Sequence, residues 1–427
     1  MNFIFFGRLA KEKGFDLLVR SLENIVHKTG ELPGNFFLFG EGDLQGDLFG
    51  KFSGTPFFED CSRLSGEEIL EKMELLGISE EGEDFKIYFF GWQSLSTIRG
   101  VLEVSHFSLM PSRFLETFGL AALESLSEGV PVIGFQKGGL IPFIPKDLAV
   151  PFSSDDGENI EALSSKIVEV AEKYSSLPAL LGEEGSDWDT LSHESRRIAD
   201  SYTEGRWMRQ VREMLPAGTG KILLVSDYTT LLGGIETHVQ TIARTLRKHG
   251  YEVEIFGWDL PKGKWTRILR LMGLPYSLCN ITSTFGIRKK IQPPNPPSQG
   301  GNTPDVIWLH SVSRFLGPLV VREVNKSGIF SMVTYHDLGL ISPFPSKVES
   351  EGMIPKTPSL RSFLDVIYSK NPILYIATCC KYFQVSILRK SLQKIHIHIV
   401  PSQFLVPYIR DIGEIPEEKI TVLEHFL

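Results

Sequence analysis

The sequence lacks the features of several large protein classes. No run approaches the ~18 uninterrupted apolar residues of a spanning helix, which excludes an integral membrane protein. The four cysteines are scattered (Cys61, Cys279, Cys379 and Cys380) and show no second ligand pair at zinc spacing. This pattern favours a reduced, cytoplasmic protein. No signal peptide is expected, because Met1 leads straight into a strand-like apolar run. Apolar residues at 42% and charged residues at 22% exclude wholesale disorder.

Basic residues are scarce in the first half and acidic residues in the second. Residues 1–215 hold 20 Lys and Arg against 36 Asp and Glu, a net charge of −16. Residues 216–427 hold 24 against 16, or +8, and the two values add to the overall −8. The asymmetry indicates either different partners for the two halves or simply different solvated surfaces.

A length of 427 residues exceeds what one core supports and predicts two domains. Short apolar runs alternate with helical periodicity in both halves, which predicts parallel α/β units. In the first half the predicted strands are 3–6, 36–39, 86–90, 107–110 and 130–134. The predicted helices there are 15–27, 67–76, 95–103, 120–128, 159–174 and 194–215.

The turn-rich segment 216–220 is the best predicted domain boundary. The expected organisation is a first domain over 1–199, a closing helix and linker over 200–220, and a second domain over 221–427. The second half is predicted to begin with strand 221–226, helix 235–249 and strand 252–257. Its later strands are predicted at 306–309, 331–335, 373–378 and 396–400. The proline-rich segment 293–301 is expected to be a loop.

The first chemical motif is the segment Gly7–Gly14, which follows a predicted strand and opens a helix. Glycine lets the backbone approach an anion, and a helix N-terminus offers unpaired N–H groups. Arg8 and Lys13 add positive charge, so a diphosphate is a fitting ligand. A charged strand-to-helix turn with a capping glycine explains the same residues.

The second motif runs from Glu116 to Glu124, after the predicted strand 107–110. Glu116 is expected in the loop and Glu124 one turn inside the following helix. Two carboxylates at the carboxyl edge of a sheet can bind hydroxyls at two places along one ligand. The helix start at Gly119 and Leu120 directs N–H groups towards a phosphate.

Two glycine pairs and several histidines follow predicted strands. Gly138-Gly139 and Gly233-Gly234 permit close backbone approach to a phosphate, although a plain turn is an equally good explanation. His310 either faces a cleft or is a structural histidine at a strand end. His396 and His398 alternate in one strand and are interpreted as structural, so no metal site is expected.

Together these motifs resemble the family 4 retaining glycosyltransferases of the GT-B fold, in which two Rossmann-like domains face each other across a cleft. The resemblance covers most of the chain. It implies that Arg8 and Lys13 hold the donor diphosphate, that Glu116 contacts the donor sugar and that Glu124 holds the ribose hydroxyls. By the same resemblance Gly7, Gly119 and Leu120 belong to the donor site, the domain over 1–199 is the donor domain, and the domain over 221–427 is the acceptor-side domain.

The resemblance also implies roles for four residues outside these two motifs. Gly233 and Gly234 match the glycine loop that closes over the phosphates. His336 matches the histidine of the sugar pocket, and Trp92 lies at the strand end that meets the nucleobase. The expected catalytic residues are therefore Arg8, Lys13, Glu116 and His336, with no metal and no cofactor besides the donor nucleotide sugar.

The order of the two domains is reversed relative to this family, which predicts a circular permutation. Met1 and Leu427 are then expected at the hinge, close enough for three or four residues to bridge them, and one chain is expected to hold a whole active site. The alternative is a fusion of two gene remnants.

The implied function is transfer of a sugar from a nucleoside-diphosphate sugar to a glycan or a lipid-linked acceptor. A non-catalytic remnant and a sugar-nucleotide epimerase on the same fold are the alternatives. Residues 262–272 place apolar side chains at helical spacing among four basic ones, which suits an anionic membrane surface or packing on their own domain. Peripheral membrane contact is thus a possible interaction, and no nucleic-acid partner is expected.

Overall fold

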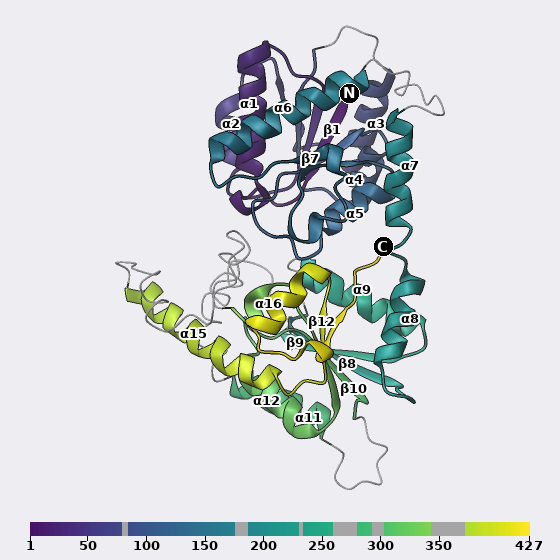
Figure 1. The fold of residues 1–427 in the computed structure, drawn as a ribbon, viewed down its shortest axis with the longest axis vertical. Coiled ribbons are helices and arrows are strands. Elements are labelled where there is room, and N and C mark those ends of the chain that lie inside the picture. The colour runs from purple at the N-terminus through teal and green to yellow at the C-terminus, as the bar shows by residue number, and fades with distance from the viewer. Residues whose placement is uncertain (79–83, 176–186, 230–233, 259–279, 293–302, 343–371) are drawn as a thin grey trace. The chain divides into compact units, whose positions relative to one another are not determined.

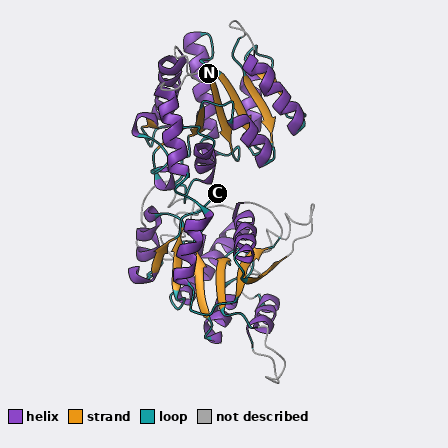
Figure 2. Cartoon of the chain, turned by 90° about the vertical axis from the view of Figure 1, so that its right-hand side faces the viewer, coloured by secondary structure: helices purple, strands orange, loops and turns teal. Residues whose placement is uncertain are grey.

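The computed structural model describes residues 1–78, 84–175, 187–229, 234–258, 280–292, 303–342 and 372–427. Contacts divide the chain into two compact units: unit 1 holds Met1–Thr203 and Leu427, and unit 2 holds Glu204–Phe426. Each unit contains one parallel sheet with helices packed against it (Figures 1 and 2). The expected α/β class is confirmed. Within the described ranges, no helix combines the length and apolar character needed to cross a bilayer.

Unit 1 is built on a seven-stranded sheet in the order β3-β4-β2-β1-β5-β6-β7. Its strands are β1 (Asn2–Phe6), β2 (Asn35–Phe39), β3 (Phe58–Asp60), β4 (Ile87–Gly91), β5 (Phe107–Met110), β6 (Val132–Phe135) and β7 (Ala149–Val150). Phe3 of central β1 pairs with Phe36 of β2 and with Phe107 of β5. All neighbours are parallel, so the carboxyl ends of the strands share one edge.

Helices cover both faces of this sheet because alternate strand residues point to opposite sides. Phe3 and Phe5 pack in the core with α1 (Phe15–Thr29), α2 (Gln45–Phe52) and α6 (Asp156–Ser175). Ile4 and Phe6 pack in the opposite core with α3 (Gly66–Ile78), α4 (Leu95–Leu102), α5 (Leu120–Ser127) and the end of α7 (Asp187–Ala199). Continuous apolar strands are typical of a sheet buried on both faces.

Unit 2 contains a six-stranded parallel sheet in the order β13-β12-β11-β10-β8-β9. The strands are β8 (Lys221–Tyr228), β9 (Glu252–Trp258), β10 (Val306–Ser311), β11 (Phe330–Thr334), β12 (Ile397–Val400) and β13 (Ile420–Val422). The helices are α8 (Glu204–Met214), α9 (Gly234–Lys248), α11 (Ile281–Ile291), α12 (Pro318–Ser327), α15 (Pro372–Leu392) and α16 (Val406–Asp411). Short 3-10 helices occupy Lys11–Lys13, Gly138–Leu140, Lys146–Leu148, Leu338–Leu340, Gln403–Leu405 and Glu417–Lys419.

The segment 194–215, predicted as one helix, is divided between two helices. The boundary between unit 1 and unit 2 lies between these two helices. α7 ends at Ala199 and α8 begins at Glu204, with Asp200, Ser201 and Thr203 between, which are residue types that favour turns and caps. Trp207 of α8 packs in the core of unit 2, stacked on Trp308 at 6.1 Å between ring centroids. The turn 216–220 therefore joins α8 to β8 inside unit 2, and the division falls between Thr203 and Glu204.

The strand predicted at 373–378 is wrong, because this segment is the first part of α15. A short apolar run does not distinguish a buried strand from a helix by its periodicity. The length of the element, which continues to Leu392, identifies it as a helix and not a strand. The other strands predicted in both halves are present, whereas β3, β7 and β13 were not predicted; they are two or three residues long.

The chain termini lie at opposite ends of α7 in unit 1 (Figure 1). Asn2 bonds to His106, whose carbonyl accepts from Trp188 in the first turn of α7. Leu427 donates to the carbonyl of Tyr202, just past the other end of that helix. A 13-residue helix is about 20 Å long, so three or four residues could not join the termini. β1 ends at the carboxyl edge of the sheet. Met1, which directly precedes β1, therefore lies at the opposite edge.

Candidate functional site

The loop after β1 is held against the exit of β5 at the carboxyl edge of unit 1. Gly14 ends the 3-10 turn 11–13 with φ 68°, a left-handed conformation. A Cβ atom on Gly14 would lie 1.7 Å from the carbonyl oxygen of Pro111. The backbone N–H of Arg113 also donates to the carbonyl of Glu12 at 3.0 Å. The two loops therefore meet backbone to backbone, and no side chain fits at position 14.

This contact brings together Lys13 and Glu116, two residues that the sequence placed in one site. The Lys13 Nζ lies 2.6 Å from the Glu116 Oε1, which also accepts a hydrogen bond from Ser112 at 2.8 Å. The Lys13 Nζ lies 4.8 Å from the centroid of the Phe114 ring. The side chains of Lys13 and Glu116 are 29% and 15% exposed, so this pair forms a partly buried polar centre.

Arg8 lies on the same loop but bonds elsewhere. Its guanidinium is 2.5 Å from the Glu12 carboxylate, and the Arg8 side chain is 62% exposed. An exposed pair of this kind contributes about 0–1 kcal/mol. An incoming diphosphate could therefore displace Glu12 from Arg8 at little cost.

Glu124 lies in the second turn of α5, as predicted, while Glu116 lies in the preceding loop. The helix begins at Leu120, and its N-cap Gly119 has no side chain to bond the first N–H groups. Burial raises the pKa of Glu124 to about 7, and the charge of Arg99 only partly opposes this shift. Glu124 can thus exchange a proton near neutral pH.

Exchanging Glu124 for glutamine should stabilise the protein at high pH. Between about pH 4.5 and 7 the folded chain holds a proton on Glu124 that the unfolded chain has lost, so stability falls as pH rises through this window. We expect Glu124→Gln to recover about 2–3 kcal/mol of unfolding free energy at pH 8 and less than about 1 kcal/mol at pH 5. Urea unfolding at both pH values measures this difference.

The matched control for this experiment is Glu169→Gln, which changes a glutamate whose side chain is 59% exposed. It should leave the pH profile of stability unchanged. Parallel profiles for wild type and Glu124→Gln would show that Glu124 titrates normally in the folded chain.

The Gly138-Gly139 pair supports the Glu116 loop directly. The N–H of Gly139 donates to the carbonyl of Glu116 at 2.6 Å. A Cβ atom on Gly139 would lie 2.6 Å from the backbone nitrogen of Phe118. Because position 139 has no side chain, two protein loops can approach each other closely there. This observation favours the interpretation of Gly138-Gly139 as a turn.

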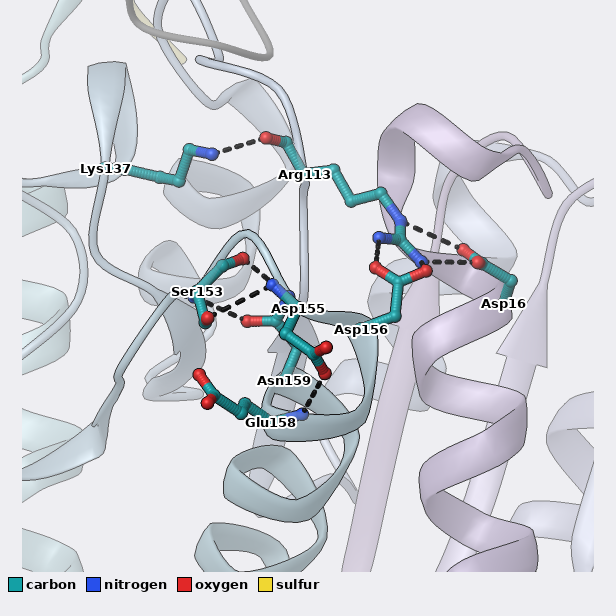
Figure 3. Close-up of polar contacts among 8 residues, drawn as sticks. All are labelled: Asp16, Arg113, Lys137, Ser153, Asp155, Asp156, Glu158 and Asn159. Atoms are coloured by element: carbon teal, nitrogen blue, oxygen red, sulfur yellow. Dashed lines mark hydrogen bonds and ion pairs between the residues drawn. The ribbon is translucent and has the colours of Figure 1, made fainter.

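A polar network that the sequence did not reveal fixes the same loop (Figure 3). The Arg113 guanidinium binds the carboxylates of Asp16 in α1 and Asp156 in α6, while Lys137 donates to the carbonyl of Arg113. The Asp16 contact measures 2.5 Å. Burial and the charge of Arg113 lower the pKa of Lys137 to about 8. The only sequence signal was an arginine directly after the Pro111-Ser112 strand exit.

The first turn of α6 is itself capped, which places Asp156 for this network. The Asp155 carboxylate accepts the N–H of Glu158 at 3.1 Å, and Asn159 exchanges hydrogen bonds with the backbone of Ser153 (Figure 3). Caps of this kind hold the first turn in one position. The loop that carries Glu116 is consequently braced from α1, α6 and the β6 exit.

Trp92 follows β4 on the same edge of the sheet, and 70% of it is exposed. A large exposed indole at a strand exit is available for stacking on a flat ligand. Gly7, the first residue after β1, donates its N–H to the carbonyl of Phe39 at 3.1 Å and so belongs to the local sheet edge.

In unit 2, His336 follows β11 and is half-buried. Its Nε2 lies 3.1 Å from the Nδ1 of His310, at the end of β10. His238 of α9 and His425, beyond β13, also contact it, with ring centroids 5.2 Å and 6.2 Å away. Gly234 starts α9, whereas Gly233 lies outside the described residues.

The sequence did not predict this histidine cluster, because its members are 26 to 187 positions apart and show no ligand spacing. Burial lowers the pKa of all four imidazoles, so they are neutral. His396 and His398 are separate from it. Their Nδ1 atoms contact Ser331 and Tyr335 respectively, the role of structural residues.

Comparisons with known proteins match both halves to glycosyltransferase domains. Residues 1–173 match a family model described as Glycosyl transferases group 1, and residues 232–426 match one described as Glycosyltransferase Family 4. The uncharacterized glycosyltransferase MJ1607 of Methanocaldococcus jannaschii is 25% identical over 146 residues, which are 34% of this chain and 30% of the relative. The chain therefore spans less than a third of that relative's length.

Solved glycosyltransferase structures resemble about half of the chain. The pneumococcal O-GlcNAc transferase GtfA, solved with UDP and GlcNAc, is 22% identical over 50% of this chain and 35% of its own, with a TM-score of 0.32. WaaG, a glycosyltransferase involved in lipopolysaccharide biosynthesis, is 17% identical over 51% of this chain and 48% of its own, with a TM-score of 0.30. These scores are low, so the family models carry the assignment. The two matched segments, residues 1–173 and 232–426, are each similar to a glycosyltransferase domain, and together they span most of the chain.

Proposed function

We propose that the protein is a retaining glycosyltransferase that moves a sugar from a nucleoside-diphosphate sugar to a hydroxyl of a glycan or lipid-linked acceptor. The observation that carries the proposal is the centre formed by Lys13, Glu116 and Ser112, within the residues that match a glycosyltransferase domain. A cation beside hydroxyl-binding groups at the carboxyl edge of a parallel sheet suits a sugar attached to a diphosphate.

The chemistry needs a group that stabilises the leaving diphosphate. Arg8 and Lys13 supply two cations on one loop, and the uncapped start of α5 supplies N–H groups. The bond from the anomeric carbon to the diphosphate oxygen breaks as the acceptor oxygen bonds to that carbon. The acceptor's proton passes to the leaving phosphate oxygen. This assignment requires neither a metal ion nor a protein nucleophile.

The acceptor is proposed to bind unit 2. The roles that the resemblance implies for His336 in sugar binding and for Gly233-Gly234 in phosphate binding stay predictions. The net charge of +8 over residues 216–427 favours an anionic or lipid-linked acceptor, presented at the cytoplasmic membrane face. The basic segment 262–272 lies outside the described residues. Liposome co-sedimentation tests the membrane contact, which salt should weaken; salt-independent binding would contradict it.

The order of the matched domains supports a circular permutation, since the group 1 match precedes the family 4 match. A direct link from Leu427 to Met1 would have to span about 20 Å, which needs six or more extended residues. A chain rejoined through such a linker and opened between Thr203 and Glu204 should unfold like the original. Loss of cooperative unfolding would favour a fusion of remnants.

A panel of nucleotides and nucleotide sugars tests the donor proposal by thermal unfolding of the full chain. A ligand at 100 times its Kd should add about 2.7 kcal/mol of stability. Product analysis then separates the classes: a transferase releases nucleoside diphosphate only with acceptor, whereas an epimerase yields an isomeric nucleotide sugar. Stabilisation by no nucleotide would contradict the proposal.

A further inference from the structure

Three histidines of unit 2 come from separate elements and converge on one point. His238 lies in α9, His336 follows β11 and His425 follows β13. One ring nitrogen of each lies within 4.8 Å of the others. The rings of His238 and His425 are closest, at 4.0 Å between centroids.

The chemistry of this cluster is that of a nitrogen-ligand cation site. Imidazole coordinates a metal through a ring nitrogen in its neutral form, and three such nitrogens meet here. Imidazole suits zinc, copper and nickel, whereas magnesium and calcium prefer oxygen.

His310 lies behind the cluster and orients one of its members. It is 1% exposed and stacks on Trp308, so its ring position is fixed. Its Nδ1 is 3.1 Å from the Nε2 of His336, which leaves the Nδ1 of His336 for a ligand. A partner for the second nitrogen of a coordinating histidine is a regular feature of metal sites. The buried Nε2 of His310 has no hydrogen-bond partner among the described residues.

We propose that unit 2 binds one divalent d-block cation, with Zn²⁺ as the probe, through His238, His336 and His425, and that His310 positions His336. Zinc bound to nitrogen at about 2.0–2.1 Å in a tetrahedron needs nitrogens roughly 3.4 Å apart. The nitrogens here lie within 4.8 Å, so small ring rotations close the site. Three protein ligands leave the fourth position to water.

The histidine cluster lies in unit 2, whereas the residues proposed to bind the donor diphosphate, Arg8 and Lys13, lie in unit 1. Because His336 is also assigned to the sugar pocket, the test measures metal binding and not turnover. The full chain is stripped with a chelator and titrated with Zn²⁺ against a competing indicator. We expect one equivalent to bind, and Co²⁺ to give the visible absorption of a four-coordinate site.

Single substitutions assign the ligands. His238→Ala, His336→Ala and His425→Ala should each weaken Zn²⁺ binding about a hundredfold or more. His310→Gln should weaken it by about 10–100-fold, as for other groups that support a ligand. The matched control is His193→Ala, since this side chain is 76% exposed in unit 1 and should not affect binding.

X-ray absorption of the wild-type zinc complex tests the site independently of any substitution. Nitrogen neighbours at about 2.0–2.1 Å are expected, and a sulfur neighbour at about 2.3 Å would place the ion on cysteine instead. A sulfur shell, an unchanged affinity in His238→Ala and His425→Ala, or the absence of stoichiometric binding would each overturn the proposal.

Discussion

Replacing Lys13 or Arg8 by alanine should lower the rate of sugar transfer by 10²-fold or more. Both cations lie on the loop after β1, and each can donate charge-assisted hydrogen bonds to the leaving diphosphate. Loss of one preorganised donor to a developing negative charge costs about 10²–10³ in turnover in other enzymes. Steady-state rates of nucleoside-diphosphate release, measured with and without acceptor, give the effect.

The control for Lys13→Ala is Lys51→Ala. Lys51 also pairs with a glutamate in unit 1, and its side chain is 32% exposed against 29% for Lys13. This variant should keep full turnover, which separates the loss of a donor from the loss of an ion pair. Thermal unfolding of each variant verifies that it is folded. If Arg8→Ala and Lys13→Ala both transferred sugar at the wild-type rate, the diphosphate assignment would be wrong.

Gly14→Ala should destabilise unit 1 by more than about 3 kcal/mol and abolish donor binding. Its new Cβ would lie 1.7 Å from the Pro111 carbonyl oxygen, a backbone atom that cannot move alone. Either the loop after β1 or the exit of β5 must then shift, at a cost typical of severe overpacking together with a left-handed alanine. The same shift would separate Lys13 from Glu116. Denaturant unfolding and nucleotide binding measure the two losses.

Gly30→Ala isolates the steric part of this effect. Gly30 caps α1 with φ 82°, close to the 68° of Gly14, but a Cβ there meets no atom within 4 Å. It should therefore cost only about 1–2 kcal/mol, the strain of a left-handed alanine. Equal losses in the two variants would show that the loops do not need their close contact.

The placement of Lys13 and Glu116 at one edge of the sheet could be predicted because it follows a local rule. Lys13 and Glu116 each lie in the loop that follows an apolar strand, and parallel strands bring such loops to one edge of the sheet. The sequence did not show that the two side chains pair with each other. That pairing depends on the contact of Gly14 with Pro111 and on the Arg113 network, which no spacing along the chain encodes.

Sequence alone determined the parallel α/β class, the two-part organisation and most strand positions, because apolar runs and helical periodicity are local properties of the chain. Tertiary structure decided three further points. It made residues 373–378 helical, it assigned α8 to unit 2 through Trp207, and it gathered His238, His310, His336 and His425 into one cluster. Each depends on which surfaces pack together, and packing joins residues that are remote along the chain.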